Sequence, residues 1–140
     1  MYSHETFYRV TYADTDQMRY MYYGQYPRLF EIGRVEAMRA LGFSYRSFEN
    51  DGILMPVLDL KSTYLKPAFY DERLKIVTTV DQMPAARIHF NYEIFNEENL
   101  KIHVAETNLA FIDGTTFKPR RIPAQFAEAL KPFFTHEQNR

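Results

Sequence analysis

The sequence predicts an α+β domain in which one long helix packs against a single antiparallel sheet. A stretch near residue 30 has helical periodicity, and stretches rich in β-branched and aromatic residues lie before and after it. Short turn-like separators join the later stretches, and such separators require antiparallel hairpins because parallel strands need long crossovers. The predicted order is therefore one strand, the helix, and four more strands.

The composition fits one domain over residues 1–140. Of these residues 46% are hydrophobic and 16% aromatic, and a chain of this length buries roughly two thirds of its unfolded surface. The 11 tyrosines and 12 phenylalanines suit a core. They equally suit interfaces and pocket walls, where a tyrosine hydroxyl still finds a hydrogen-bonding partner. Both interpretations stay open.

Charge and cysteine content exclude several classes of function. The formal net charge of −1 creates no field that would attract nucleic acid or an anionic membrane. The absence of cysteine removes disulfides, cysteine metal sites and a cysteine nucleophile. The first ten residues are too polar for a signal peptide, and no apolar run is long enough for a membrane span. We therefore expect a cytoplasmic protein without membrane insertion.

The first strand is expected over residues 5–13, a loop over 14–17, and the helix over about 24–41. Pro27 falls in the first helical turn, where proline is tolerated, and Gly42 stands where a C-cap glycine belongs. One helix face carries apolar or small residues at spacings of three and four: Tyr26, Phe30, Gly33, Ala37 and Leu41.

The later elements are expected over residues 54–66, 72–82, 86–96 and 100–113 as strands, and over 124–133 as a short helix. Residues 44–50 form either a second short helix or an irregular loop. A sheet of five long strands leaves unpaired edges. Because pairing across a two-fold axis removes such an edge, we expect a homo-oligomer.

Asp14 and Asp16 are the first candidates for chemistry, because they lie in the loop before the helix. A helix N-terminus presents unpaired N–H groups and partial positive charge, which can polarise a carbonyl and stabilise an oxyanion. A carboxylate beside such donors suits acyl transfer, by attacking the carbonyl or by activating water. From these residues alone, a helix-capping role for an Asp is the more frequent one.

A basic loop, Lys118, Arg120 and Arg121, is the second candidate. Three cations in four residues could hold a phosphate-bearing ligand, or could form an ordinary solvated loop. The histidines, His4, His89, His103 and His136, show no metal-ligand spacing. We therefore expect no metal site, and structural or surface roles for all of them.

One segment resembles the signature of the 4-hydroxybenzoyl-CoA thioesterase-like group of hotdog proteins: Asp14-Thr-Asp-Gln-Met-Arg-Tyr-Met-Tyr-Tyr-Gly-Gln-Tyr26. Asp14 and Asp16 match its Asp-x-Asp, Tyr22 and Tyr23 match its aromatic pair, and Tyr26 is the Tyr three residues later. Residues 30–36 resemble the central helix of the family, and the resemblance covers nearly the whole chain.

The resemblance implies a hotdog fold, in which a five-stranded antiparallel sheet wraps the long central helix. It implies an acyl-CoA thioesterase that forms a homodimer or homotetramer, with active sites at the dimer interface. The reaction hydrolyses a thioester to a carboxylic acid and free CoA. It uses no cofactor beyond the coenzyme A of the substrate itself.

The resemblance also assigns residues. Asp16 takes the position of the catalytic carboxylate, and the N–H of Tyr23 that of the oxyanion donor. Tyr22 and Tyr26 are candidate substrate contacts, with interface packing as the alternative. CoA phosphates are assigned to the basic loop and, less strongly, to Arg87.

Arg19 departs from the signature, because many members have glycine there, which permits positive φ or close approach. Arg19 could narrow the access of the thioester, pair with Asp14 or Asp16, or contact an anionic acyl group. A tight pair with Asp16 would lower the pKa of that carboxyl and weaken it as a base.

Two rival functions therefore stay open. The first is a non-catalytic acyl-CoA-binding protein disabled by Arg19. The second is a hydratase or dehydratase, which usually relies on a histidine with an acidic partner. No histidine lies near residues 14–26 in the sequence, which counts against this rival, although strand histidines could approach the loop in the fold. The acyl group, the nucleophilic or general-base role of Asp16, and the choice between dimer and tetramer are not decided by the sequence.

Overall fold

The computed structural model describes residues 1–135 and confirms the predicted α+β architecture. The strands are β1 (Tyr2–Arg9), β2 (Ile53–Leu54), β3 (Val57–Tyr64), β4 (Arg73–Val80), β5 (Arg87–Phe95), β6 (Lys101–Ala110) and β7 (Ile112–Asp113). The α-helices are α1 (Tyr26–Arg39), α2 (Tyr45–Asn50) and α3 (Ala124–Leu130). Short 3-10 helices are η1 (Tyr12–Asp14), η2 (Tyr23–Gln25) and η3 (Lys131–Phe133). His136, one of the four histidines of the sequence, lies outside the described residues.

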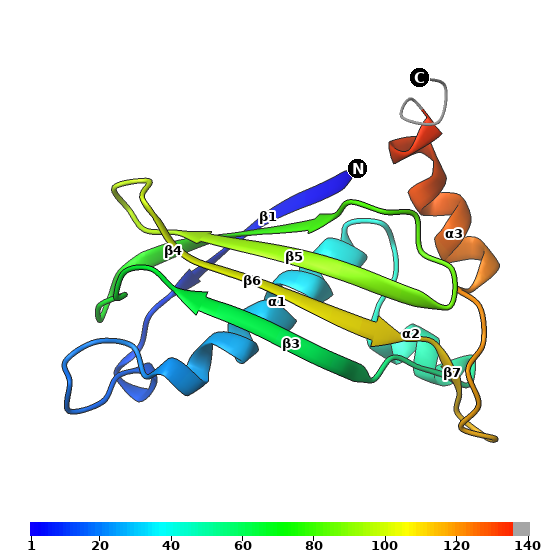
Figure 1. Cartoon of the computed structure of the whole chain (residues 1–140), viewed down its shortest axis with the longest axis horizontal. Coiled ribbons are helices and arrows are strands. Elements are labelled where there is room, and N and C mark those ends of the chain that lie inside the picture. The colour runs from blue at the N-terminus through cyan, green and yellow to red at the C-terminus, as the bar shows by residue number, and fades with distance from the viewer. Residues whose placement is uncertain (136–140) are drawn as a thin grey trace.

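The main sheet has five antiparallel strands in the order β1-β4-β5-β6-β3. It curves around α1, which lies along its inner face (Figure 1). This is the hotdog arrangement that the resemblance implied. Strands β2 and β7 form a separate two-stranded sheet beyond the end of α1.

The core lies between α1 and the inner face of the sheet. On β5 the side chains of Ile88, Phe90, Tyr92 and Ile94 are buried, which confirms the alternation expected for that strand. Gly33 lets α1 approach β4 closely, because a Cβ added there would lie 3.0 Å from Ile76 Cγ2 and closer still to the Thr78 hydroxyl.

Three predicted boundaries were wrong for local reasons. The strand expected over 5–13 begins at Tyr2 and ends at Arg9, because Thr11 and Asp14 bond to each other and wind the chain into η1. The helix expected over 24–41 begins as η2 and is α-helical only from Tyr26 to Arg39. The strand expected over 54–66 is broken before Val57 at Pro56, which has no N–H to donate.

The strand β3 is an edge of the sheet and stays poorly covered. Its residues Leu58, Leu60 and Tyr64 are 46%, 42% and 48% exposed, whereas the opposite edge strand, β1, packs against α1.

In the part of the chain that the structure describes, no helix has the length and apolar character needed to cross a membrane.

Candidate active site

Asp16 lies at the tip of a small hairpin between β1 and α1. The N–H of Tyr22 donates to the carbonyl of Asp14 (2.7 Å), Thr15 and Met21 form a bridge, and the N–H of Asp16 donates to the carbonyl of Tyr20 (3.3 Å). The Asp16 carboxylate is exposed and accepts the Met18 N–H at 2.8 Å. This hairpin orients a carboxylate that remains open to solvent.

Arg19 closes the hairpin in a left-handed backbone conformation, with a φ of 71°. It is the last of three loop residues between Asp16 and Tyr20, and its N–H donates to the Asp16 carbonyl (3.0 Å). Three-residue hairpin loops commonly place glycine at this left-handed position, which explains the glycine of the family signature. Within residues 1–135 Arg19 forms no ion pair with Asp14 or Asp16, so the pairing considered from the sequence is absent there.

The returning arm of the hairpin leads directly into the N-terminus of the helical segment. Tyr22 is the N-cap of η2, which continues without interruption into α1. The N–H of Tyr23 has no acceptor within the helix, and it takes part in none of the hydrogen bonds found among residues 1–135. The N-cap residue of α1 is Gln25, so neither aspartate caps the long helix.

A hollow of about 280 Å³ opens beside this N-terminus. Tyr64 closes one side of it and donates its hydroxyl to the Tyr23 carbonyl at 2.7 Å. Tyr26 is buried in the wall, and burial raises the pKa of its hydroxyl to about 12. The full lining is Tyr20, Met21, Tyr23, Tyr26, Tyr64, Leu65, Lys66 and Pro67. Tyr22 is 40% exposed and lies outside this lining.

His103 lies behind the wall of this hollow, on β6. Its ring stacks on Tyr26 (4.1 Å between centroids) and meets the edge of Tyr64 (4.6 Å), while its Nε2 pairs with the Ser62 hydroxyl at 2.5 Å. Burial lowers its pKa to about 4, so the imidazole is neutral near pH 7. The sequence placed no histidine near the hairpin, because β6 reaches it only in the folded chain.

Asp14 does not share the exposure of Asp16. Its side chain is buried and accepts hydrogen bonds from Tyr8 (2.6 Å), from the N–H (2.8 Å) and hydroxyl (3.0 Å) of Thr11, and from Arg28 (3.0 Å). Burial alone would raise the pKa of this carboxyl, but these hydrogen bonds outweigh burial and lower it. Asp14 is therefore an ionised structural group.

The predicted CoA-binding residues gather at the other end of the domain. Arg87 begins β5 beside the end of β6, while Lys118, Arg120 and Arg121 lie in the loop after β7. Figure 1 shows the hairpin at the start of α1 and β7 at the opposite end. The 14 residues of α1 separate these ends by about 21 Å, so one protomer does not bring the basic loop to Asp16.

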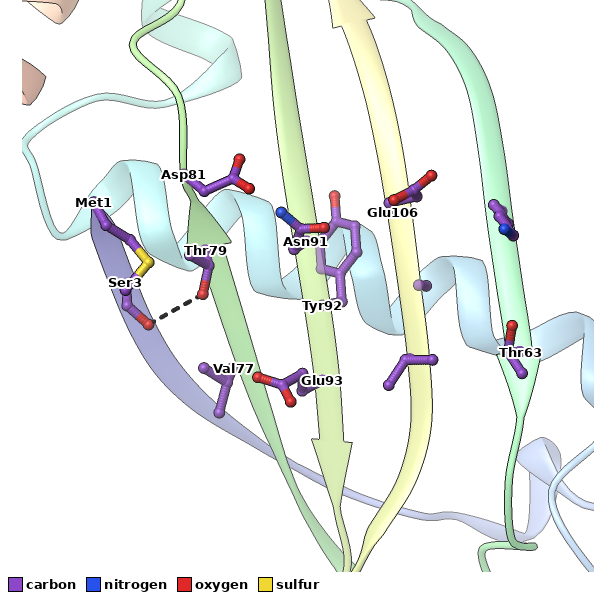
Figure 2. A pocket seen from close by; sticks show the side chains of 13 residues that line it. Met1, Ser3, Thr63, Val77, Thr79, Asp81, Asn91, Tyr92, Glu93 and Glu106 are labelled. Atoms are coloured by element: carbon purple, nitrogen blue, oxygen red, sulfur yellow. Dashed lines mark hydrogen bonds between the residues drawn. The ribbon is translucent and has the colours of Figure 1, made fainter.

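Another hollow, of about 620 Å³, is a different feature. It lies on the outer face of the sheet and presents Thr79, Asp81, Asn91, Glu93 and Glu106 (Figure 2). The N-terminus of α1 is on the other face of the sheet, so its N–H groups do not reach this outer hollow. The smaller hollow beside Tyr23 is therefore the better candidate for acyl chemistry.

An exposed carboxylate on a hairpin that leads into a helix N-terminus, on a hotdog scaffold, is the arrangement of hydrolases that act on activated acyl groups. A family model described as "Thioesterase-like superfamily" matches residues 10–130. The chain belongs to this superfamily. It is a thioester hydrolase.

Similar proteins agree with this placement. YneP of Bacillus subtilis, an acyl-CoA thioesterase candidate, is 32% identical over 127 residues, covering 90% of this chain and 88% of that protein. Acyl-CoA thioesterase YbgC of Haemophilus influenzae is 29% identical and covers 87% of this chain and 90% of its own. The crystal structure of a DHNA-CoA thioesterase from Staphylococcus aureus superimposes with a TM-score of 0.92 at 35% identity, covering 99% and 95% of the two chains.

Proposed function

We propose that this protein hydrolyses acyl-CoA thioesters, with Asp16 as the catalytic carboxylate and the Tyr23 N–H as the oxyanion donor. The observation that carries the proposal is the free Tyr23 N–H at a helix N-terminus, next to the hairpin that presents Asp16. The pKa of the Tyr22 hydroxyl is raised mainly by its hydrogen bond to Tyr23 and by the charge of Tyr23, then by desolvation, and to a smaller extent by the charge of Asp16. The charge of Asp16 therefore acts on Tyr22, the residue directly before the proposed donor Tyr23.

The reaction consumes one water and needs no redox step. The thioester carbonyl accepts the Tyr23 N–H, which stabilises the negative oxygen as the tetrahedral intermediate forms. Asp16 either attacks the carbonyl carbon or takes a proton from the attacking water. The C–S bond then breaks, and the CoA sulfur leaves and is protonated. If water attacked, the acyl group leaves directly as a carboxylic acid; if Asp16 attacked, water then hydrolyses the mixed anhydride to release the acid and restore the carboxylate. No metal or other cofactor is part of this proposal.

Aromatic acyl groups are the substrate class that we infer first. Tyr20, Tyr23, Tyr26 and Tyr64 line the hollow, and tyrosine rings stack well against planar aromatic groups. The S. aureus protein is a DHNA-CoA thioesterase, and a 26% identical protein of Thermosynechococcus vestitus is a 1,4-dihydroxy-2-naphthoyl-CoA hydrolase. Arg19 is exposed beside the same hairpin and remains a candidate contact for polar acyl groups.

A homodimer formed through β3 would complete the site. The edge of β3 offers unpaired backbone groups and exposed apolar side chains that a second copy can cover. A two-fold axis across β3 pairs the strand antiparallel with its copy. In such a dimer the end of the partner that carries the basic loop lies beside Tyr64, the last residue of β3, which lines the hollow. Arg87, Lys118, Arg120 and Arg121 would then bind CoA phosphates in trans, at sites assembled by both protomers.

The test is thiol release from short-chain, long-chain and aromatic acyl-CoAs by the wild type and by Asp16→Asn. We expect fastest turnover on aromatic acyl-CoAs, and a loss of about 100-fold or more in kcat for the variant, the size expected when an acid–base group is lost. Asp81→Asn is the matched control, because Asp81 is an exposed aspartate on the larger, outer hollow. It should turn over like the wild type.

Two outcomes would contradict the proposal. If Asp81→Asn loses activity and Asp16→Asn does not, the chemistry belongs to the outer face of the sheet. If a folded wild type releases no thiol from any acyl-CoA, the CoA substrate class is wrong. The cytoplasmic location expected from the sequence stays a prediction.

A further inference from the structure

Asp14 is an unusually well-bonded carboxylate for a loop residue. It is 1% exposed, and four donors from three residues converge on it. Those residues belong to different elements: Tyr8 to β1, Thr11 to the turn after it, and Arg28 to the first turn of α1. Arg28 also donates to the Tyr8 hydroxyl, so the three side chains form one network. Asp14 therefore ties the end of β1 to the start of α1.

The backbone of Asp14 reaches the proposed oxyanion donor through Tyr22. The Tyr22 N–H donates to the Asp14 carbonyl at 2.7 Å, and the Tyr22 carbonyl accepts the Gln25 N–H at 3.0 Å. The peptide group before Tyr22 is thus held by Asp14, and the peptide group between Tyr22 and Tyr23 is held by Gln25. The latter peptide group carries the Tyr23 N–H and is linked to the former through Tyr22, so its direction depends on where Asp14 is held.

The same residue also locates the proposed catalytic carboxylate. Asp16 follows Asp14 by two residues, on the outgoing arm of the hairpin whose returning arm contains Tyr22. Both reacting groups are consequently attached to one anchor. A shift of about 1 Å in such an anchor can lower a rate by about 100-fold without removing any reacting group.

We propose that Asp14 is a positioning residue for thioester hydrolysis, which sets the relation between the Asp16 carboxylate and the Tyr23 N–H through its bonds to Arg28 and Tyr22. This rests on the function proposed above. Asp14 itself does not touch the substrate, because its carboxylate is enclosed by Tyr8, Thr11 and Arg28. The ion pair with Arg28 is the part of the network that connects Asp14 directly to α1, the helix whose start carries the donor.

The experiment measures kcat and KM separately for thiol release by Asp14→Asn, Arg28→Met and Arg28→Lys. We expect Asp14→Asn to lower kcat by about 10- to 100-fold with KM within about twofold of the wild type. Arg28→Met should lower kcat in the same way but less, and Arg28→Lys should recover most of the loss because a lysine can still pair with Asp14. Arg28 is half exposed, so its variants are expected to fold even if Asp14→Asn does not.

Arg9→Met is the matched control. Arg9 is the last residue of β1 and, like Arg28, forms an ion pair with an aspartate, but its pair with Asp71 (3.8 Å) is exposed on both sides. Arg9→Met should keep the wild-type kcat. A kcat within about twofold of the wild type in folded Arg28→Met and Asp14→Asn would overturn the inference while Asp16→Asn remains inactive. A raised KM with an unchanged kcat in these variants would also overturn it. Full activity of Asp16→Asn would instead overturn the proposed function.

Discussion

His103 makes the stability of this protein depend on pH between about 4 and 6.5. The imidazole is fully buried, and burial lowers its pKa from 6.5 to about 4. Between these values the unfolded chain binds a proton that the folded chain rejects. The contribution of neutral His103 to the free energy of unfolding is complete above about pH 6.5. It is lost as the pH falls, and it changes no further below about pH 4.

At about pH 5 the unfolded histidine is almost fully protonated and the folded one is still mostly neutral. Linkage then gives a loss of about 2 kcal/mol in the free energy of unfolding relative to about pH 8. This is a large share of the 5–15 kcal/mol typical of a folded domain. We therefore expect a marked fall in the urea midpoint between the two pH values.

The assay is equilibrium urea unfolding followed by circular dichroism, at one fixed protein concentration because oligomers couple stability to concentration. His103→Phe keeps a ring against Tyr26 but cannot titrate, so it should lose about 2 kcal/mol less than the wild type between the two pH values. His89→Gln, on the outer face of the sheet, is the control and should lose as much as the wild type. Equal losses in His103→Phe and the wild type would refute the reasoning.

Two further substitutions test backbone features by urea unfolding. Gly33→Ala should destabilise the fold by about 1–3 kcal/mol, because the added Cβ has no space against Ile76 and Thr78; an unchanged midpoint would show that β4 can move aside. Arg19→Gly should stabilise it by about 0.5–1 kcal/mol, because removing a steric cost of about 1–2 kcal/mol at a φ of 71° outweighs the roughly 0.5–1 kcal/mol of extra entropy that glycine loses on folding. The control Arg9→Gly, in extended β1, should destabilise, and a matching loss in Arg19→Gly would contradict the assignment of strain.

The sequence was most informative where the determining contacts are local or periodic. The alternation along β5 and the three- and four-residue spacing along α1 each predicted the buried face, and Gly42 ends the helix with a φ of 92° as expected. The end of the first strand was wrong because the Asp14 carboxylate bonds the nearby Thr11 N–H. Such short-range bonds compete with strand formation and have no periodic signal.

The site could be predicted only in its local part. Asp16 and Tyr23 are close in sequence, so one motif contains both. Tyr64 bonds Tyr23 from 41 residues away, and His103 reaches Tyr26 from another strand. Those contacts depend on the order of the strands in the sheet, which the secondary-structure propensities of single residues do not predict. The separation of the basic loop from the hairpin is likewise a property of the folded domain.

Arg19 stands where the family signature has glycine, and it lies in the hairpin that presents Asp16. A non-glycine residue with positive φ costs about 1–2 kcal/mol and persists only where its surroundings hold it. Here the surroundings are two hairpin bonds, one donated by the Tyr22 N–H to the Asp14 carbonyl and one donated by the Asp16 N–H to the Tyr20 carbonyl. The loop therefore keeps the conformation that glycine would favour, while adding a cation beside an exposed carboxylate. Since the backbone gains nothing from arginine, we propose that its charge is the property that matters, and that this charge favours an acyl group bearing a polar or anionic substituent.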